Sequence, residues 1–574
     1  MATEPSEKSL SSAIADGNQI VNNNSTAIKK TTSNSSDPSH SSAPLDYFQD
    51  DEEAQRNEIA RIKTNESLQE QDNIARILSR RSTNRGPIPT MGGNRDYPPE
   101  LGDQKIYQVD FDGPNDPIHP HNWPLSTKLV ICFGLGLTTL TVAWGSSIFS
   151  SAIPYITKKW HVANVVGTLG ISLYVLGFAS GPVIWSPVSE LYGRKMPILL
   201  SSLLFTCFTF AAATSKDLQT LLLTRFFAGF TGSAPLTVVA AAFSDMFGNE
   251  TRGKALLIFS GTVFCGPLVA PIVGGFIAES YLGWRWTMYI TGIMAGACLI
   301  FNVFFLKETY HPVILVDKAR EIRERTGNWG VFAAHERVEL DLNSIVKNNL
   351  TRPLEMLVVE PIILLLSIYS AFIYGILYLF MSAYPIVFME GYGMSLGVGM
   401  LPYIGLVVGQ LLSLVAMMLI FEPYYNKKLA ANGGKPVPEA RLPPMITGGI
   451  IFPIGLLWFT WAGNYHESVP WIVPALSGLF TGFGLLSIFL PCINYIVDSY
   501  LFFAASALAG NTFLRSSFGA VFPLFATFMF HGMGTNWAGL LLGLVGLVLV
   551  PVPMLFMKYG KRIRTRSKYA FVLN

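Results

Sequence analysis

The chain has 574 residues, of which 50% are hydrophobic and only 14% are charged, with a formal net charge of +3. Soluble domains carry about a quarter charged residues, so this composition excludes an ordinary soluble protein. The net charge excludes no class of partner, because the placement of charge along the chain matters more than its sum. Apolar residues concentrate after residue 125. We therefore expect an integral membrane protein with a polar N-terminal tail.

The tail, residues 1–125, is rich in Ser, Asn, Thr and charged residues and poor in aromatic ones. Such a segment cannot bury enough apolar surface to fold, so we expect a disordered cytosolic tail. Its serines are either phosphorylation sites or ordinary solvated residues. It lacks the apolar core of a secretory signal peptide, so the first spanning helix directs insertion. At its end, the proline-rich stretch Asp116–Pro124 is expected to be extended, with Trp123 at the membrane interface.

Twelve apolar segments of spanning length follow. The first six lie near 127–152, 165–187, 197–214, 219–243, 255–279 and 286–306, and the second six near 361–389, 396–421, 444–463, 470–497, 503–530 and 537–557. The pattern predicts an all-α membrane fold of twelve helices in two six-helix bundles. The expected parts are a first bundle (126–306), a cytosolic central loop (307–360), a second bundle (361–557) and a basic cytosolic tail (558–574).

Basic residues gather in the final tail, the central loop and the even-numbered connections. Because cytosolic loops are rich in Lys and Arg, both termini and the central loop are predicted to lie in the cytosol. The glycosylation motif at Asn249 then faces the cytosol and should carry no glycan. The five cysteines all stand in apolar segments without metal or disulfide spacing, so we expect them to serve in packing.

The two halves also resemble copies of one unit. An acidic-to-basic segment, Glu190–Lys195, follows the second span, and a similar one, Glu422–Lys428, follows the eighth. Asp245 ends the fourth span and Asp498 ends the tenth. Matching positions in both halves are what a duplicated six-helix transporter unit predicts.

The fifth span, Leu257–Glu279, is unusually rich in glycine and proline. Residues four apart share one helix face, which gives two adjacent rows of small or rigid residues: Gly266, Ala270 and Gly274, and beside them Pro267, Pro271 and Gly275. Small residues let a neighbouring helix approach closely. The rows predict a kinked helix with a flat face, used either for tight static packing or as a moving interface.

This glycine–proline pattern resembles the fifth-helix signature of proton-coupled drug antiporters of the major facilitator superfamily, with Ala270 where relatives often have glycine. Asp116–Pro124, Trp284–Trp286 and Lys307–Pro312 resemble signatures of the fungal members. The resemblance covers about residues 110–570 and is nearest to the yeast polyamine and multidrug exporters. It implies alternating access by a plasma-membrane protein, expected to be monomeric, with a small molecule and protons as its ligands.

The segment from Glu190 to Lys195 resembles the superfamily signature between the second and third helices, with Glu190 where Asp is usual. Gly193 permits a tight turn, and the Arg194 guanidinium suits a forked pairing with Asp245. Glu190 is expected to face the N-terminus of the eleventh helix. We predict that these contacts form a latch that joins the bundles on the cytosolic side and favours the outward-open state. The alternative is that the charges only set topology.

Two arginines lie inside predicted spans, where a charge needs a partner or a wet cavity. Arg225 resembles the arginine of the fourth-helix signature that the family links with proton coupling. Since arginine keeps its proton, it would bias the pKa of a neighbour or bind an anion; the alternative is snorkelling to the membrane surface. Arg515 lies near Asn511 on the eleventh helix, and its expected partner is Asp498.

No carboxylate stands in the middle of any predicted span, which weakens a strict polyamine interpretation and leaves the proton carrier unnamed. The residues predicted to line the substrate cavity are Tyr174, Tyr374, Tyr378, Tyr495, Asn511 and Arg515. Tyrosine rings hold cationic or planar molecules, and a cavity with few fixed polar contacts suits many substrates. For each aromatic residue alone, core packing is the alternative.

The sequence has no phosphate-binding Gly-Lys-Ser/Thr loop, so we expect no ATP-driven step. The histidines form neither a catalytic triad nor a metal cluster in sequence, and we expect no enzyme, cofactor, metal or nucleic-acid partner. The predicted function is proton-driven export of organic cations, polyamines or hydrophobic drugs. A proton symporter that imports nutrients or metabolites is the main alternative, and a non-transporting receptor is a more distant one.

Overall fold

The computed structural model describes residues 107–574 apart from 114, 338–350, 434–435, 501–502 and 571–574, and apart from the side chains of residues 249–250. Met1–Glu100 and Leu101–Asn574 form separate units, and only the second falls among the described residues. The predicted disorder of residues 1–106 and the side chain of Asn249 thus lie outside them. Apart from one bridge between Gln108 and Phe332, all regular structure in the described part of the chain is helical.

The first bundle follows the predicted spans. It contains α2 (Leu125–Ser147), which continues through η3 (Ile148–Ala152) into α3 (Ile153–Trp160), then α4 (Asn164–Ser180), α5 (Pro182–Tyr192), α6 (Lys195–Thr214), α7 (Leu218–Met246), α8 (Asn249–Glu279) and α9 (Arg285–Phe305). The helices α4 and α5 form one span bent by 41°. The bend falls at Pro182, which lacks the N–H that would continue the helix ladder.

The second bundle repeats the arrangement. It contains α13 (Pro361–Tyr384) with η6 (Pro385–Gly391), α14 (Leu396–Met400), α15 (Tyr403–Ala416) with η7 (Met417–Phe421) and α16 (Glu422–Ala431), α17 (Pro443–Asn464), α18 (Ile472–Ser499), α19 (Ala504–Met533), α20 (Thr535–Leu549) and α21 (Pro551–Arg564). The described residues include 11 helices long and apolar enough to span a membrane, or 12 with the bent pair counted as one. The predicted number of spans is confirmed.

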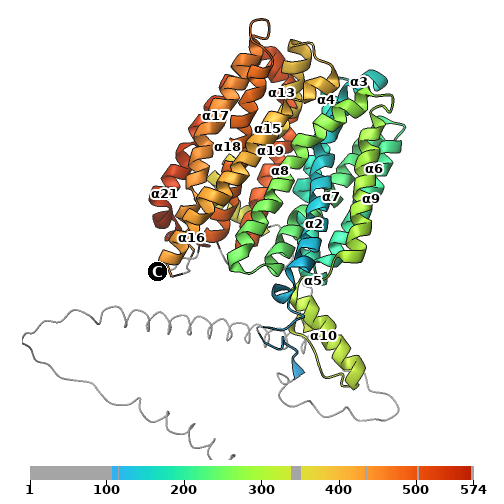
Figure 1. The fold of residues 1–574 in the computed structure, drawn as a ribbon, viewed down its shortest axis with the longest axis vertical. Coiled ribbons are helices and arrows are strands. Elements are labelled where there is room, and N and C mark those ends of the chain that lie inside the picture. Colours follow the sequence, from blue (N-terminus) through green and yellow to red (C-terminus); the bar gives the residue numbers. More distant parts are fainter. Residues whose placement is uncertain (1–106, 114, 338–350, 434–435, 501–502, 571–574) are drawn as a thin grey trace, which may run out of the picture. The chain divides into compact units, whose positions relative to one another are not determined.

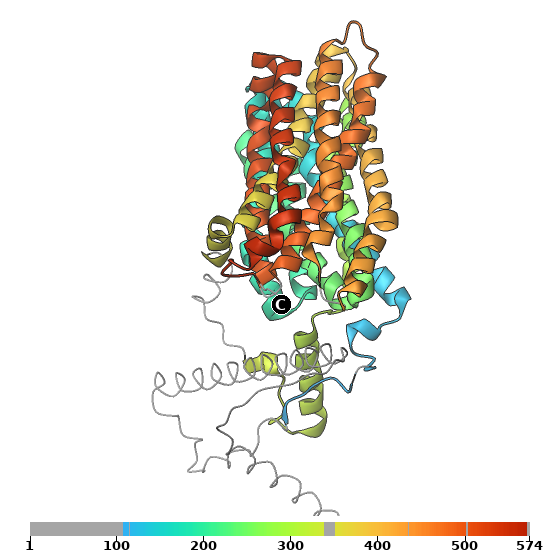
Figure 2. The ribbon, with the colours of Figure 1, turned by 90° about the vertical axis from the view of Figure 1, so that its left-hand side faces the viewer.

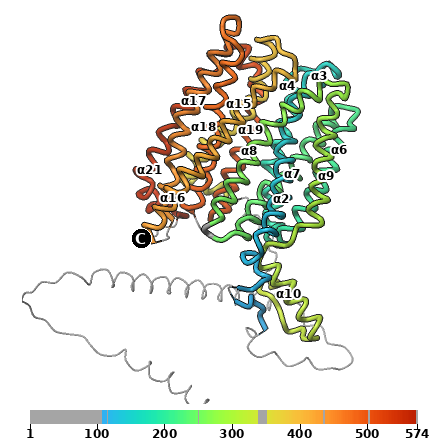
Figure 3. Tube along the Cα trace, in the orientation of Figure 1, coloured from blue at the N-terminus to red at the C-terminus, as the bar shows by residue number. Residues whose placement is uncertain are grey.

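Figure 1 shows the two bundles beside each other, α2 to α9 on the right and α13 to α21 on the left. Figure 2 gives the view turned by 90°, and Figure 3 traces the chain from one bundle into the other. We call the end near α10 (His311–Thr326) the loop end and the opposite end, near α3, the far end. The bundles meet where α8 packs against α14 and α15, and where α4 packs against α19.

The second span is divided between these contacts. Its far-end half, α4, packs on α19 of the second bundle, whereas its loop-end half, α5, packs on α6 and α7 of its own bundle. The interface between α4 and α19 is therefore closed at the far end. At the centre lies α13, because 83% of the apolar stretch that would cross the membrane within Pro361–Gly391 is buried.

Residues 107–113 and 115–124, which we assigned to the disordered tail, are folded onto the central loop. Val109 N donates to the Phe332 carbonyl at 2.9 Å, and the Lys318 ammonium lies 3.0 Å from the Asp112 carboxylate. Asp116 is buried and accepts the backbone N–H of Ile118 at 2.8 Å. The predicted tail boundary is wrong here because these short-range bonds and the bridge to the loop supply order that composition alone does not indicate.

The same region brings three histidines together beside the end of α7. The ring centres of His119 and His311 are 4.4 Å apart, and those of His121 and His311 are 5.4 Å apart. His311 Nε2 lies 3.1 Å from the backbone carbonyl of Asp245. The central loop is thus attached to the fourth span, and its described residues include the helices α10 and α12 (Arg352–Val359).

Candidate functional site

Arg225 on α7 is buried, with 2% of its surface exposed, and its partners are backbone carbonyls. Its Nε donates to Gly170 O at 3.1 Å, Nη1 to Gly145 O at 2.7 Å and Nη2 to Ser146 O at 3.2 Å. The guanidinium also lies 4.2 Å from the ring centre of Tyr174. The arginine therefore joins α7 to α2 and α4 without a carboxylate. Its two carbonyl partners lie in the last turn of α2, before the tighter η3 turn begins at Ile148.

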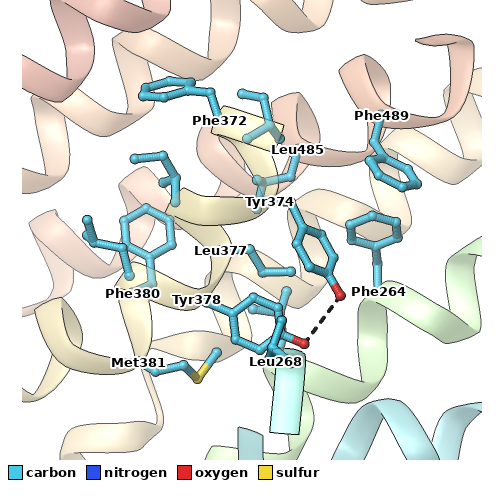
Figure 4. Packing of buried hydrophobic residues seen from close by; sticks show 14 of the residues in the cluster. Phe264, Leu268, Phe372, Tyr374, Leu377, Tyr378, Phe380, Met381, Leu485 and Phe489 are labelled. Carbon is cyan, nitrogen blue, oxygen red and sulfur yellow. Dashed lines mark hydrogen bonds between the residues drawn. The ribbon is translucent and has the colours of Figure 1, made fainter. Parts of the chain in front are cut away.

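A hydrogen-bonded chain leads from this arginine into the second bundle. Ser146 accepts Arg225 with its carbonyl, and its hydroxyl accepts from Tyr378 OH of α13 at 2.9 Å. The hydroxyls of Tyr378 and Tyr374 are 3.4 Å apart. Figure 4 shows this pair among the rings of Phe264 and Phe489. The chain crosses between bundles in the membrane interior, where breaking a polar contact is costly.

Arg515 on α19 stands at the other end of the chain. Its guanidinium lies 4.9 Å from the ring centre of Tyr374 and 5.0 Å from that of Phe489. Its Nε is buried and has no hydrogen-bond acceptor among the described residues. The prediction that Asp498 is the partner of Arg515 is wrong. Asp498 instead accepts from Arg441 Nε at 3.2 Å, because it stands at the loop end of α18 whereas Arg515 lies about 16 Å along α19.

The other predicted cavity residues divide between the site and the packing around it. Tyr174 belongs to the site: it supports Arg225 and donates to Val142 O at 2.8 Å. Asn511 donates to Ser370 Oγ at 2.7 Å and so fastens α19 to α13. Tyr495 is not brought to the site. It lies near the loop end, 3.4 Å from Nη1 of Arg564 and stacked on Phe556.

The charge of this centre is positive. Across the spans that the structure describes, every carboxylate stands near a helix end: Glu190, Asp245, Glu279, Glu360, Glu390, Glu422 and Asp498. The chain from Arg515 to Arg225 therefore holds two guanidinium groups and neutral hydroxyls. The absence of a carboxylate from the middle of the described spans agrees with the sequence. The residue that carries the proton stays unnamed.

At the loop end of the first bundle, the predicted ion pair is present. Arg194 Nε lies 3.0 Å from Asp245 Oδ2, and the guanidinium stacks over Tyr310 at 4.4 Å. Gly193 has φ of +83°, and a methyl group there would collide with the carboxylate of Glu308. Glu308, which we did not assign a role, accepts the backbone N–H of Arg194 at 2.8 Å and of Lys195 at 3.0 Å.

Glu190, predicted to face the N-terminus of the eleventh helix, makes no side-chain hydrogen bond to it among the described residues. Glu190 is exposed at the end of α5, and no hydrogen bond or ion pair of its side chain is recorded within the described residues. The closed contacts between α4 and α19 lie at the far end instead. The role of the latch therefore stays a prediction about a different conformation, while the Arg194–Asp245 pair is a bond within one bundle.

The second bundle holds a matching cluster that sequence reasoning found only in part. Arg441 lies 3.2 Å from Asp498 and 3.1 Å from Glu422, and its guanidinium is 3.3 Å from the ring centre of Tyr425. Asp498 thus corresponds to Asp245, as expected, but the arginine comes from the short turn that precedes α17 rather than from the basic segment after the eighth span. Its position before the third helix of its half, like that of Arg194, is the signal that could have identified it.

The two faces of α8 have different neighbours. A methyl group on Gly266 would lie 2.8 Å from Ala143 Cβ, and one on Gly274 would lie 2.8 Å from Ile148 Cγ1, so this row packs on the first span. A methyl group on Gly275 would lie 3.0 Å from the Leu396 carbonyl of the second bundle. Pro267 and Pro271 are buried inside α8, which is one continuous helix from Asn249 to Glu279. The row with Gly266 and Gly274 therefore packs within the first bundle, and Gly275 in the adjacent row contacts the second bundle.

A cap across the bundles adjoins Gly275. Glu279, the last residue of α8, accepts the backbone N–H of Gly397 at 2.8 Å and the hydroxyl of Ser395 at 3.2 Å. Both donors lie at the N-terminus of α14, where unpaired N–H groups favour a negative charge. This contact helps to close the far end between α8 and α14.

Two six-helix bundles joined through a buried polar centre are the architecture of secondary transporters. Residues 135–523 match the family model described as the Major Facilitator Superfamily, and the chain belongs to this superfamily. The resemblance noted in the sequence is confirmed.

Among known relatives, the Multidrug transporter TPO1_1 of Candida glabrata is 54% identical over 483 residues, covering 84% of each chain. The Major facilitator superfamily multidrug transporter FLU1 of Candida albicans is 50% identical over 522 residues, covering 90% of this chain and 85% of the relative. Among solved structures, the xylose transporter XylE from E. coli, in a partially occluded inward open conformation, has a TM-score of 0.53 at 16% identity, covering 76% of this chain and 98% of that chain. This last likeness concerns the fold alone.

Proposed function

We propose that the protein is a proton-coupled exporter of hydrophobic drugs, organic cations or polyamines that works as a monomer by alternating access in the plasma membrane. Two relatives at or above 50% identity over most of this chain carry the name multidrug transporter, which supports export of drugs over nutrient import. The loop end is then the cytosolic end, in agreement with its Lys and Arg content.

The observation that carries this proposal is the chain Arg225–Ser146–Tyr378, which links the bundles at a buried centre. Opening the far side requires this chain and the cap from Glu279 to Gly397 to break. In the opposite state, Glu190 at the end of α5 would approach the N-terminus of α19. Two sets of contacts that exclude each other are what alternating access needs, because each state must be closed on one side.

Arg225 would serve proton coupling through its fixed charge. It keeps its proton, so it acts on a partner whose protonation state changes during the cycle. Three carbonyls on two neighbouring helices hold its guanidinium in place. A movement of α2 against α13 would change this set of bonds and with it the field at the centre.

The test uses the full-length protein in liposomes with an imposed proton gradient and rhodamine 6G as the transported probe. We expect accumulation that an uncoupler abolishes and that Arg225→Lys lowers at least tenfold. Arg285→Lys is the matched control, because Arg285 also donates to backbone carbonyls, those of Ala213 at 3.1 Å and Ser215 at 2.6 Å, but lies at the start of α9. Accumulation that resists the uncoupler would reject proton coupling.

A further inference from the structure

Arg515 differs from Arg225, the other arginine of the site, in the hydrogen-bond acceptors around it. Arg225 has three carbonyl acceptors, whereas the Nε of Arg515 is buried without one in the part of the chain that the structure describes. Tyr374 presents its ring to Arg515, and its hydroxyl points to Tyr378. A guanidinium in apolar surroundings is costly unless an anion or an acceptor pairs with it. An acceptor is therefore missing at this position.

The surroundings of Arg515 are aromatic and come from both bundles. The ring of Phe264 on α8 lies 4.4 Å from that of Phe489 on α18, and 6.3 Å from that of Tyr374 on α13 (Figure 4). The rings of Tyr374 and Phe489 are stacked with their centres 6.4 Å apart. Such faces bind a planar or apolar body, and they hold the guanidinium from the side by cation–π attraction.

These groups lie at successive depths from the loop end. At 1.5 Å per helical residue, Arg515 lies about 16 Å along α19, Tyr374 about 20 Å along α13 and Tyr378 about 26 Å along it. Both helices begin at the loop end. Counted from this end, Arg515 comes first, and the tyrosine pair with its bond to Ser146 lies beyond it. Arg515 as a whole residue is half-buried, while its Nε is buried.

We propose that Arg515 binds the carboxylate of an aromatic or amphipathic organic anion, whose apolar body lies against Phe264, Tyr374 and Phe489. The proposal rests on the proposed export function and adds organic anions to its substrate classes. A guanidinium edge offers Nε and one Nη in a fork that matches a carboxylate. One carboxylate balances one guanidinium, whereas a phosphate monoester adds a second charge that is costly to desolvate among aromatic rings.

The charge of the centre supports the same class. Arg225 stands at the opposite end of the hydrogen-bonded chain and adds a second fixed positive charge. The carboxylates of the described spans lie near the helix ends. Like charges repel more strongly away from water. A polyamine with several positive charges therefore gains least at this site, and an ionised organic acid gains most.

The test measures binding to the purified full-length protein in nanodiscs at pH 7.5, with three probes of nearly equal shape: naphthalene-2-carboxylate, naphthalene-2-carboxamide and 2-naphthylmethylammonium. We expect the carboxylate to bind at least tenfold more tightly than the amide, and the ammonium to bind more weakly than the amide. Arg515→Gln should weaken carboxylate binding at least tenfold and change amide binding by less than about threefold. Arg515→Lys, which keeps the charge but loses the fork, should lie in between.

Arg285→Gln is the control, because it removes one positive charge of the same kind at the far end and should leave all three affinities unchanged. A thermal melt of each variant shows that it is folded. Equal binding of carboxylate and amide to the unaltered protein would overturn the proposal. So would an Arg515→Gln variant that loses affinity for all three probes alike, since that result assigns Arg515 to packing.

This binding test needs no transport, so its failure is distinct from failure of the exporter proposal. Uptake that resists an uncoupler, together with a carboxylate preference that depends on Arg515, would reject proton-driven export and keep the anion site. Uncoupler-sensitive uptake of rhodamine 6G without a carboxylate preference would keep the exporter and reject the anion site.

Discussion

Replacing Gly275 by valine should shift the balance between the two conformations of the transporter. Gly275 lies where α8 crosses α14 of the second bundle at the far end. A methyl group on it would lie 3.0 Å from the Leu396 carbonyl, 3.1 Å from Met400 Cγ and 3.2 Å from Gly397 Cα. Two of these three atoms belong to backbone, which cannot rotate away. The bundles must therefore separate at this point to admit the side chain.

The size of the effect follows from the cost of overpacking. Inserting methyl groups into a close-packed contact costs about 1–3 kcal/mol. The cost is present only while the far end is closed, so it moves the conformational equilibrium toward the state with the far end open. Since 1.4 kcal/mol is a factor of ten, the expected shift is about 5- to 150-fold.

The assay is a distance measurement between spin labels at Tyr281, which is 97% exposed after α8, and Tyr465, which is 52% exposed after α17. The five native cysteines are replaced first. We expect Gly275→Val to enrich the longer distances. The matched control is Gly274→Ala, whose methyl meets Ile148 within the first bundle and should lower stability without moving the bundles.

Two results would refute this reasoning. The first is a folded Gly275→Val protein whose distance distribution equals that of the unaltered chain. The second is a Gly274→Ala protein that enriches the longer distances as much as Gly275→Val does.

Three further predictions concern the loop end. Glu308→Gln should lower stability by about 2–3 kcal/mol, because its charge-assisted bonds to the backbone N–H groups of Arg194, Lys195, Thr309 and Tyr310 weaken; an unchanged melting temperature would contradict this. Arg441→Lys should lower the melting temperature by several degrees and slow rhodamine uptake, because one lysine does not replace the fork between Asp498 and Glu422; unaltered values would show that the cluster is dispensable. Burial holds the pKa of the clustered histidines below the ordinary value of about 6.5. The unfolded chain therefore binds more protons, and the stability of the fold should decrease as the pH drops below that value. Melting curves at several pH values should show this decrease, and His311→Gln should reduce the slope of stability against pH. The histidines concerned are His119, His121 and His311.

The sequence by itself determined the spans and their division into two halves. A stretch such as 361–389 is apolar over a membrane thickness, and this is a local property that no tertiary contact is needed to read. The Arg194–Asp245 pair was also predictable, because a motif on a short turn brings its arginine to the end of a neighbouring span. Polar composition, in contrast, misassigned residues 107–113 and 115–124, whose order depends on partners in the central loop.

Only the tertiary structure decided which buried residues meet. Arg515 and Asp498 are 17 positions apart, yet a helix end separates them and Arg441 takes the acid instead. Tyr495 and Tyr374 both sit on apolar helices, but depth along the helix places one near the loop end and the other at the centre. Adjacent glycines at 274 and 275 face different bundles. Hydropathy locates a helix in the membrane, whereas its rotation and depth are set by packing against helices that are distant in the sequence.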